Sequence, residues 1–288
     1  MLTSLSEPEQ GSGGETILQS ALHGAPWEAP QTAGLPGTEP CAQAAWLTID
    51  DAYAGQMRLR ATLIERRRTD VIAALPGSEA TLEELYGFVL RSVSARPDFS
   101  LKTDGARDDT PVRAVRPDGV PVTLDAGDPL ATLGRLVAED LCVLQRVDGD
   151  AGHRLTAAVL CFPAHWSLQE KLGRTMARIH APVEEYDAHL ERRVQRMLDA
   201  LRPGLVLTRM NCLPSVVPDL FTPQTEADEA AHSDPHGPYL RSERQCLWRL
   251  PETGAVAFSI QTRMVRRSDL TPAQRAGYAR WRAAQGLP

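Results

Sequence analysis

Residues 140–183, which read DLCVLQRVDGDAGHRLTAAVLCFPAHWSLQEKLGRTMARIHAPV, determine how the chain is expected to fold. Two β-rich runs, residues 141–147 and 155–162, lie on either side of the Asp- and Gly-rich residues 148–152, and this pattern predicts a β-hairpin. The second run is almost continuously apolar, which indicates a strand covered on both faces by helices, by another sheet or by a flat apolar ligand. Pro163 has no N–H for further pairing and therefore ends that strand.

A short helix is expected after the hairpin. Ser167, with Glu170 three residues on, has the pattern of a capping box. The helix is expected to end near Arg178, because Pro182 disfavours helical geometry in the residue before it and cannot continue the hydrogen-bond ladder. His180 is thus predicted just past a short helix, on backbone that the proline holds in place.

The composition is that of a soluble globular protein. The chain has 288 residues, of which 42% are hydrophobic and 24% charged, and a formal net charge of -6. The acidic balance argues against a nucleic-acid-binding protein. No apolar stretch approaches the ~20 residues of a membrane span. The N-terminus lacks the basic and apolar segments of a signal peptide, so we expect a cytoplasmic location and no membrane partner.

The five cysteines predict buried, reduced thiols. None belongs to a CxxC pair and four lie in strand-like runs, so a disulfide framework is not expected. A haem-thiolate ligand stays open as the alternative. The cysteines are Cys41, Cys142, Cys161, Cys212 and Cys246.

The remaining elements indicate one α+β domain with a mainly antiparallel sheet, since helices come first and hairpins with interposed helices follow. Residues 1–44 are rich in Gly, Pro, Ser, Glu and Gln and predict a mobile leader or a loosely attached arm. We expect the domain over residues 45–265 and a helical tail over residues 266–288. The predicted elements are a helix over 53–75, a helix capped by Thr81 and Glu84, a hairpin over 112–124, a helix over 128–138, a helix over 186–201, a strand over 205–213, a polar loop over 223–238, a hairpin over 241–264 and a helix capped by Thr271.

The seven histidines are the first candidates for metal chemistry. His153, His165 and His180 gather around the central hairpin and its helix. Considered alone, each is more often a hydrogen-bonded structural residue than a ligand. The other four fall in loop-like surroundings or on an amphipathic helix: His23, His189, His232 and His236.

Several motifs together resemble one known family. They are FP at 162–163, EKLG at 170–173, IHAPV at 179–183, DLC at 140–142, PYLRSER at 238–244 and LP with GA at 250–255. Over residues 46–265 the chain resembles the family that includes the haem-binding alpha subunit of haem-dependent oxidative N-demethylase, also described as dimethylamine monooxygenase. The resemblance implies a PAS-like fold with an antiparallel sheet and flanking helices.

The resemblance also implies a b-type haem with His180 as the axial metal ligand. A ligand histidine coordinates through a neutral imidazole nitrogen while its other N–H donates to a carbonyl or carboxylate. Glu184 and Glu185 are candidates for that acceptor. His165 is the second choice, as a distal group or as the ligand itself.

Cationic side chains are expected to hold the haem propionates. Lys171, Arg174 and Arg178 share a short segment with His180, and Arg209 follows on a predicted strand. Arginine is well suited to bidentate recognition of a carboxylate.

The activity that the resemblance implies is oxidative N-demethylation of a small secondary amine with dioxygen. The chain has no flavin, iron–sulfur, P-loop, GxGxxG, HExxH or GxSxG signature, so electrons are expected from a separate flavin/iron-sulfur reductase. The catalytic residues are not identified. The alternative is a non-catalytic PAS-like haem sensor or interaction protein.

Overall fold

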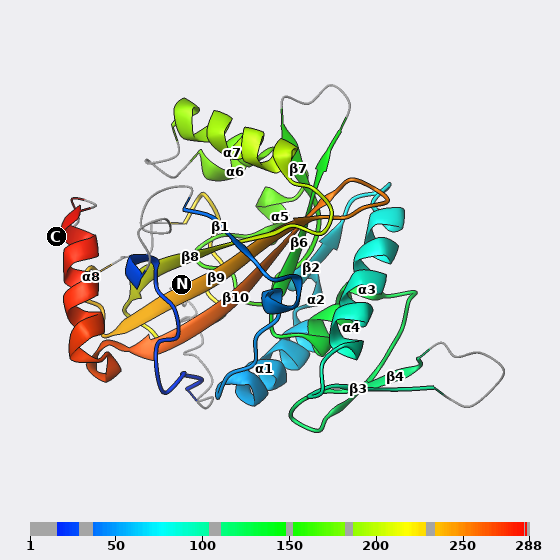
Figure 1. The fold of residues 1–288 in the computed structure, drawn as a ribbon, viewed down its shortest axis with the longest axis horizontal. Helices are drawn as coiled ribbons and strands as arrows, with labels where there is room; N and C mark the ends of the chain where they lie inside the picture. The colour runs from blue at the N-terminus through cyan, green and yellow to red at the C-terminus, as the bar shows by residue number, and fades with distance from the viewer. Residues whose placement is uncertain are drawn as a thin grey trace, which may run out of the picture.

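An antiparallel sheet of seven strands runs through the computed structural model (Figure 1), in the order β1-β8-β9-β10-β6-β7-β2. The structure describes residues 16–28, 37–103, 111–147, 152–181, 187–228, 234–284 and 286. The predicted α+β class with a mainly antiparallel sheet is confirmed. The strands are β1 (Glu39–Cys41), β2 (Ile72–Ala74), β6 (Asp140–Arg146), β7 (His153–Val159), β8 (Val206–Ser215), β9 (Tyr239–Arg249) and β10 (Val256–Arg266).

Three hairpins occur where local turn signals predict them. β6 pairs with β7 around the turn at residues 147–152, of which 148–151 lie outside the described residues. β9 pairs with β10 along eleven positions. A second, three-stranded sheet holds the hairpin predicted over 112–124, and it consists of β3 (Ser100–Lys102), β4 (Arg113–Val115) and β5 (Pro121–Thr123).

The two faces of the seven-stranded sheet are covered by different helices (Figure 1). One face packs against α1 (Tyr53–Arg66), α3 (Glu79–Ser94) and α4 (Pro129–Leu136), with Trp248 of β9 stacked on Phe88 at 4.9 Å. The opposite face packs against α5 (Leu168–Lys171), α6 (Met176–His180) and α7 (Ala188–Ala200). Within the described ranges, no helix has both the length and the apolar composition to cross a bilayer.

A fully buried ion pair locks the central hairpin to α1. The Asp140 carboxylate accepts hydrogen bonds from Arg60 Nη1 at 2.5 Å and from the backbone N–H groups of Cys161 and Phe162 at 2.7 and 2.9 Å. The other Arg60 nitrogens donate to the carbonyls of Gly134 and Glu139. Because every charged atom has a partner, the pair satisfies the condition under which buried charges are tolerated.

The long helix predicted over 53–75 is wrong in its second half. The helix α1 ends at Arg66, the single turn α2 (Arg68–Val71) follows, and residues 72–74 form β2 on the edge of the sheet. β2 pairs with β7, and the Leu160 N–H donates to the Val71 carbonyl beside it. The apolar residues there belong to a strand that forms by pairing with β7. The helical spacing of apolar residues in the local sequence does not reveal that pairing.

The capping box predicted for Thr81 and Glu84 is also wrong. α3 begins after Ser78, and Glu84 accepts hydrogen bonds from the backbone N–H groups of Glu252 and Thr253 and from the Thr253 hydroxyl. The carboxylate therefore caps the β9–β10 turn, where Gly254 has a positive φ of 70°.

The N-terminal and C-terminal segments pack together at one end of the sheet. Leu22 and Ala25 share a core cluster with Tyr278 of α8 (Pro272–Ala284). The capping of α8 by Thr271 is confirmed, since the Gln274 N–H donates to the Thr271 hydroxyl at 3.2 Å. Three short 3-10 turns complete the described structure, η1 (Pro26–Glu28), η2 (Gln43–Trp46) and η3 (Arg267–Asp269).

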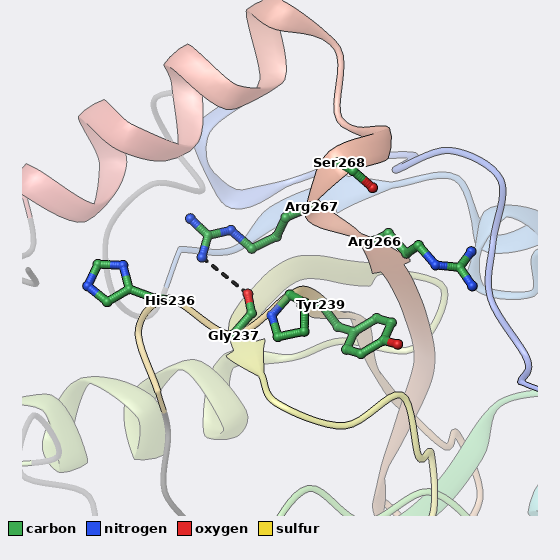
Figure 2. A pocket seen from close by; sticks show the side chains of 7 residues that line it. His236, Gly237, Tyr239, Arg266, Arg267 and Ser268 are labelled. Atoms are coloured by element: carbon green, nitrogen blue, oxygen red, sulfur yellow. Dashed lines mark hydrogen bonds between the residues drawn. The ribbon is translucent and has the colours of Figure 1, made fainter.

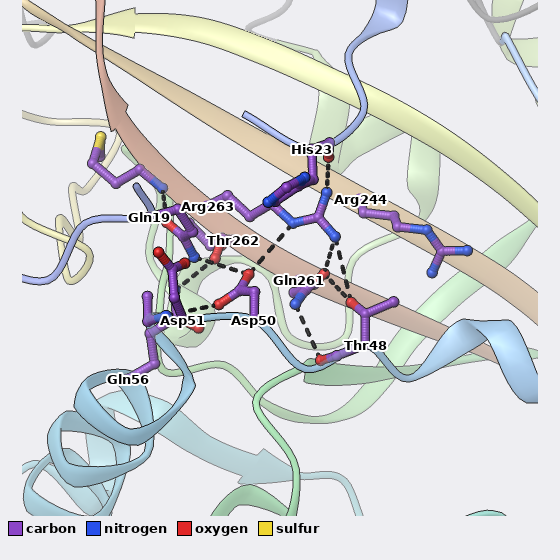
Figure 3. A network of polar contacts seen from close by, with 12 residues as sticks. Gln19, His23, Thr48, Asp50, Asp51, Gln56, Arg244, Gln261, Thr262 and Arg263 are labelled. Carbon is purple, nitrogen blue, oxygen red and sulfur yellow. Dashed lines mark hydrogen bonds and ion pairs between the residues drawn. The ribbon is translucent and has the colours of Figure 1, made fainter. Parts of the chain in front are cut away.

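A buried polar network fastens the N-terminal segment to β10 (Figure 3). Arg263 donates to the His23 carbonyl and to Gln261 Oε1, and its Nε lies 3.7 Å from the Asp50 carboxylate. Gln19 accepts the Met264 N–H at 2.7 Å. These contacts hold Gln19 and His23 against β10, and the division of the chain into a leader or loosely attached arm, a domain and a tail stays a prediction.

Candidate functional site

The site candidates lie on the segment that joins β7 to α7. The single helix predicted from Ser167 to Arg178 is wrong, because the segment forms two short helices, α5 and α6. Gly173, between them, has a positive φ of 74° and donates its N–H to the Leu155 carbonyl on β7. Ser167 makes no side-chain cap, whereas the Thr175 hydroxyl accepts the Arg178 N–H and caps α6. The backbone of β7 thus splits the helix.

His180 is the last residue of α6 rather than the first residue past a helix. Its Nδ1 lies 2.9 Å from the Met176 carbonyl oxygen. A carbonyl only accepts hydrogen bonds, so Nδ1 carries the proton and the lone pair of the neutral ring is on Nε2. Pro182, Glu184 and Glu185 lie outside the described residues.

The surroundings keep His180 neutral at pH 7. Burial lowers the pKa of His180, and the positive charges of Arg209 and Lys171 lower it further, against the opposing effect of the Met176 carbonyl. A neutral imidazole is the form that binds a metal ion. The histidine is therefore held in the protonation state and tautomer that an axial ligand requires.

Arg209 reaches this region from β8. Its side chain shares a face of the sheet with Gln245, its direct partner on β9. The Nε atom is buried and has no hydrogen-bond partner. Burial lowers the pKa of Arg209, and the Glu243 carboxylate opposes that shift. A buried guanidinium nitrogen without an acceptor costs free energy, so the position suits an anionic ligand group.

Glu226 joins two of the four predicted propionate partners. Its carboxylate accepts from Lys171 Nζ at 2.8 Å and from the Arg178 guanidinium at 3.1 and 2.7 Å. Hydrogen bonds from Arg178 and Lys171 lower the pKa of Glu226 to about 2. Lys171 is buried and Arg178 exposed, and Arg174 is exposed as well, with its Nε near the Glu170 carbonyl. Sequence reasoning missed Glu226 because it comes from the polar loop before β9.

His165 has a different set of neighbours from His180. It is the one non-glycine residue with a positive φ in the described part of the chain, at 57°. Its N–H donates to the Thr222 carbonyl at 3.0 Å, and the pKa of its ring is lowered by burial and by Arg241. The structure therefore places His165 at the junction after β7, and its role as a distal group or ligand stays a prediction.

Sequence reasoning also missed a polar row along β9. Arg241, Glu243 and Gln245 alternate on the sheet face that Arg209 shares, and Glu243 accepts hydrogen bonds from the other two at 3.3 and 3.0 Å. Arg241 also donates to the carbonyls of Leu220 and Phe162. The signal for this row was the period of two within residues 239–249.

The remaining titratable candidates are structural. His153 is buried, and its Nδ1 is 2.9 Å from the Gln195 side chain. All five cysteines are free, as predicted, and four are buried. Burial raises the pKa of Cys161 and of Cys212 to about 12 and so favours the neutral thiol. A cysteine binds a metal as the thiolate.

The donor set near His180 fits a haem group. Haem iron needs only one or two axial ligands from the protein, and a neutral His180 provides one. The unpartnered Arg209 Nε and the buried Lys171 provide cationic partners for carboxylates. Across the described residues no three His, Cys, Asp or Glu side chains gather as they would to hold a bare metal ion.

One comparison with known proteins identifies the family. The model of the family described as haem-dependent oxidative N-demethylase, alpha subunit-like, matches residues 37–288, which is most of the chain. The description indicates dependence on haem, and the term alpha subunit implies a system with further components. The family resemblance read from the motifs is confirmed. The chain belongs to the haem-dependent oxidative N-demethylase alpha subunit-like family.

Proposed function

We propose that the chain is a haem-dependent monooxygenase that N-demethylates a small secondary amine, with electrons from a separate flavin/iron-sulfur reductase. The observation that carries the proposal is the neutral His180, whose Nδ1 proton is held by the Met176 carbonyl beside the charges of Arg209 and Lys171. The antiparallel sheet with helices on both faces supports a PAS-like fold for this haem subunit.

His180 is assigned as the iron ligand and Arg209 and Lys171 as partners of the propionates. Arg174 and Arg178 lie on the exposed side of the same segment, where Arg178 shares Glu226 with Lys171. The group is a b-type haem in this proposal, since the free cysteines include no CxxC pair that would attach it covalently.

Bound haem would supply the activation of dioxygen, which no side chain can provide. The overall reaction consumes one secondary amine, one dioxygen, two electrons and two protons. It yields one primary amine, one formaldehyde and one water. A C–H bond of the N-methyl group becomes C–OH, and the C–N bond then breaks with return of a proton to nitrogen. The polypeptide binds and orients the reactants and holds His180 as the unprotonated donor at Nε2.

The first test is the His180→Ala variant. Reconstitution of the full chain with haemin is expected to give a Soret band that H180A loses or shifts, because the axial nitrogen is gone. Added imidazole is expected to restore the band in part. The circular dichroism of H180A should match that of the parent chain.

The matched control is His165→Ala, which is expected to keep the ligand spectrum. An unchanged spectrum in H180A would refute the ligand assignment and direct attention to His165, His153 or Cys161. Turnover is measured as formaldehyde released from dimethylamine with oxygen and a reductant. A haem-replete chain that releases none would favour a haem sensor, and a chain that takes up no haem would contradict both functions.

A further inference from the structure

A second candidate site does not involve His180. It lies between α8, η3 and the loop at residues 234–238. Two adjoining cavities of about 560 and 360 Å³ open there, and His236, Arg267 and Ser268 line both of them. Figure 2 shows the smaller one, with the Arg267 guanidinium near Gly237 of the loop and the Arg266 side chain extending in the opposite direction. The larger is completed by Leu270, Arg275, Tyr278, Ala279, Arg282 and Ala283.

The described lining of this depression is positively charged. Among the described residues that line the two cavities there are four arginines and no carboxylate. The acidic residues next to it in the chain have other roles: Asp234 accepts the His236 N–H at 2.7 Å, and Asp269 accepts the Ser268 hydroxyl at 2.9 Å. The helix α8 contains no acidic residue.

Two of the arginines converge on the same uncharged groups. Arg267 Nη1 and Arg282 Nη1 both donate to the Pro235 carbonyl, at 3.2 and 2.5 Å. Their guanidinium carbons lie 5.4 and 5.6 Å from the centre of the Tyr278 ring. A carbonyl dipole and a ring quadrupole compensate two full charges only in part, so like-charge repulsion stays in the structure.

The strongest sign of a missing ligand is Arg282. Its side chain is 7% exposed, and its Nε is buried without a hydrogen-bond partner. A charged group so poorly solvated normally has a counterion and a full set of acceptors. The site thus has a donor that no described residue satisfies.

We propose that this depression binds the phosphate group of a small organic phosphate ester. A phosphate presents three oxygens and up to two charges, which matches several guanidinium forks better than one carboxylate does. Leu270, Ala279 and Ala283 offer an apolar wall for the organic part. The volume of about 560 Å³ lies in the range of small-molecule sites, about 300–1,000 Å³.

Calorimetric titration of the full chain tests the proposal, with glycerol 3-phosphate as the probe and glycerol as its neutral twin. The phosphate ester is expected to bind and glycerol not. Arg275→Gln and Arg282→Lys are expected to weaken binding about tenfold each, since each loses a charge-assisted hydrogen bond. Higher salt should weaken binding further.

The matched control is Arg280→Gln, an exposed α8 residue outside both cavities, which is expected to bind as the parent chain does. Thermal unfolding checks that each variant is folded. The proposal is overturned if glycerol 3-phosphate gives no heat of binding at millimolar concentration, or if R275Q and R280Q bind equally. The result does not depend on haem, so it stands apart from the test of the N-demethylase.

Discussion

A single backbone carbonyl determines the chemistry available at His180. Because Met176 accepts the Nδ1 proton, Nε2 is the nitrogen that would bind iron in the proposed role, and burial together with the neighbouring cations keeps the ring neutral. The sequence predicted that His180 would be fixed in place, but it attributed this to the proline and the acidic residues that follow His180 in the chain. The actual acceptor is four residues earlier, within the same short helix, which a motif match does not reveal.

Substitution of Arg209 distinguishes a ligand-binding role of this side chain from a structural one. We expect Arg209→Met to leave the haem-free chain at least as stable, since it removes a buried donor whose lack of a partner costs about 1–3 kcal/mol. Haem affinity is expected to fall about tenfold with the loss of a propionate partner. Urea unfolding and haem titration measure the two effects.

The control for Arg209 is Arg174→Met, which removes an exposed charge from the same candidate set and should change neither quantity. If R209M lost several kcal/mol of stability and kept its haem affinity, Arg209 would be a structural residue only.

The stability that Glu226 provides through Lys171 and Arg178 is expected to depend on pH. Its pKa is lowered from 4.5 to about 2 in the folded chain, so its contribution to stability is complete above pH 4.5 and is lost as the pH falls toward 2. We expect Glu226→Gln to be less stable than the parent at pH 7, and this difference to shrink below pH 4.5 and to vanish as the pH falls through 2. Urea unfolding at several pH values measures the difference.

An exposed carboxylate on α1 serves as the reference for that comparison. Glu65→Gln should track the parent chain at every pH. A deficit of E226Q that stayed constant from pH 7 to pH 2 would mean that ionisation of Glu226 plays no part in it.

At the scale of elements, local patterns predicted the hairpins and failed where partners are distant in sequence. The turns at residues 116–119 and 250–255 join strands that are neighbours in the chain, so Gly, Pro and Asp signals were sufficient. The strand β2 forms only because β7 offers an edge, and α5 and α6 separate because β7 binds the backbone between them. The spacing of apolar residues along a helix or strand does not show which distant segment it will pair with.

Glu84 shows the same principle in a form that can be measured. Its three hydrogen bonds reach residues 168 and 169 positions away, on the β9–β10 turn. We expect Glu84→Ala to lower the free energy of unfolding by about 1–3 kcal/mol, because two backbone N–H groups lose their acceptor. Urea denaturation measures the loss.

The neighbouring Glu83→Ala is the matched control, because Glu83 is exposed on the same turn of α3. It is expected to change stability by no more than about 0.5 kcal/mol. Equal effects of the two substitutions would show that helix propensity, and not the turn cap, accounts for the loss at Glu84.

At the scale of the whole molecule, the two faces of the seven-stranded sheet contain different features. The face under α1, α3 and α4 holds the aromatic core and the Arg60–Asp140 pair, and the face under α5, α6 and α7 holds the haem candidates. The motifs point to the segment that bears the proposed ligand, because IHAPV is local. Arg209 was among the propionate partners predicted from the sequence, but the motifs did not predict that β9 and the loop before β9 contribute Glu243 and Glu226.

The packing of the N-terminal segment on α8 has a consequence for biosynthesis. Gln274 donates to the Leu22 carbonyl across 252 positions, and Trp27 lies 5.3 Å from Tyr278 between ring centres. Residues 16–28 leave the ribosome well before α8, and they meet these partners only after α8 has been made. Contacts between such distant segments form slowly and leave apolar surface open to aggregation meanwhile. The nascent chain therefore carries an unprotected Trp27 until α8 emerges.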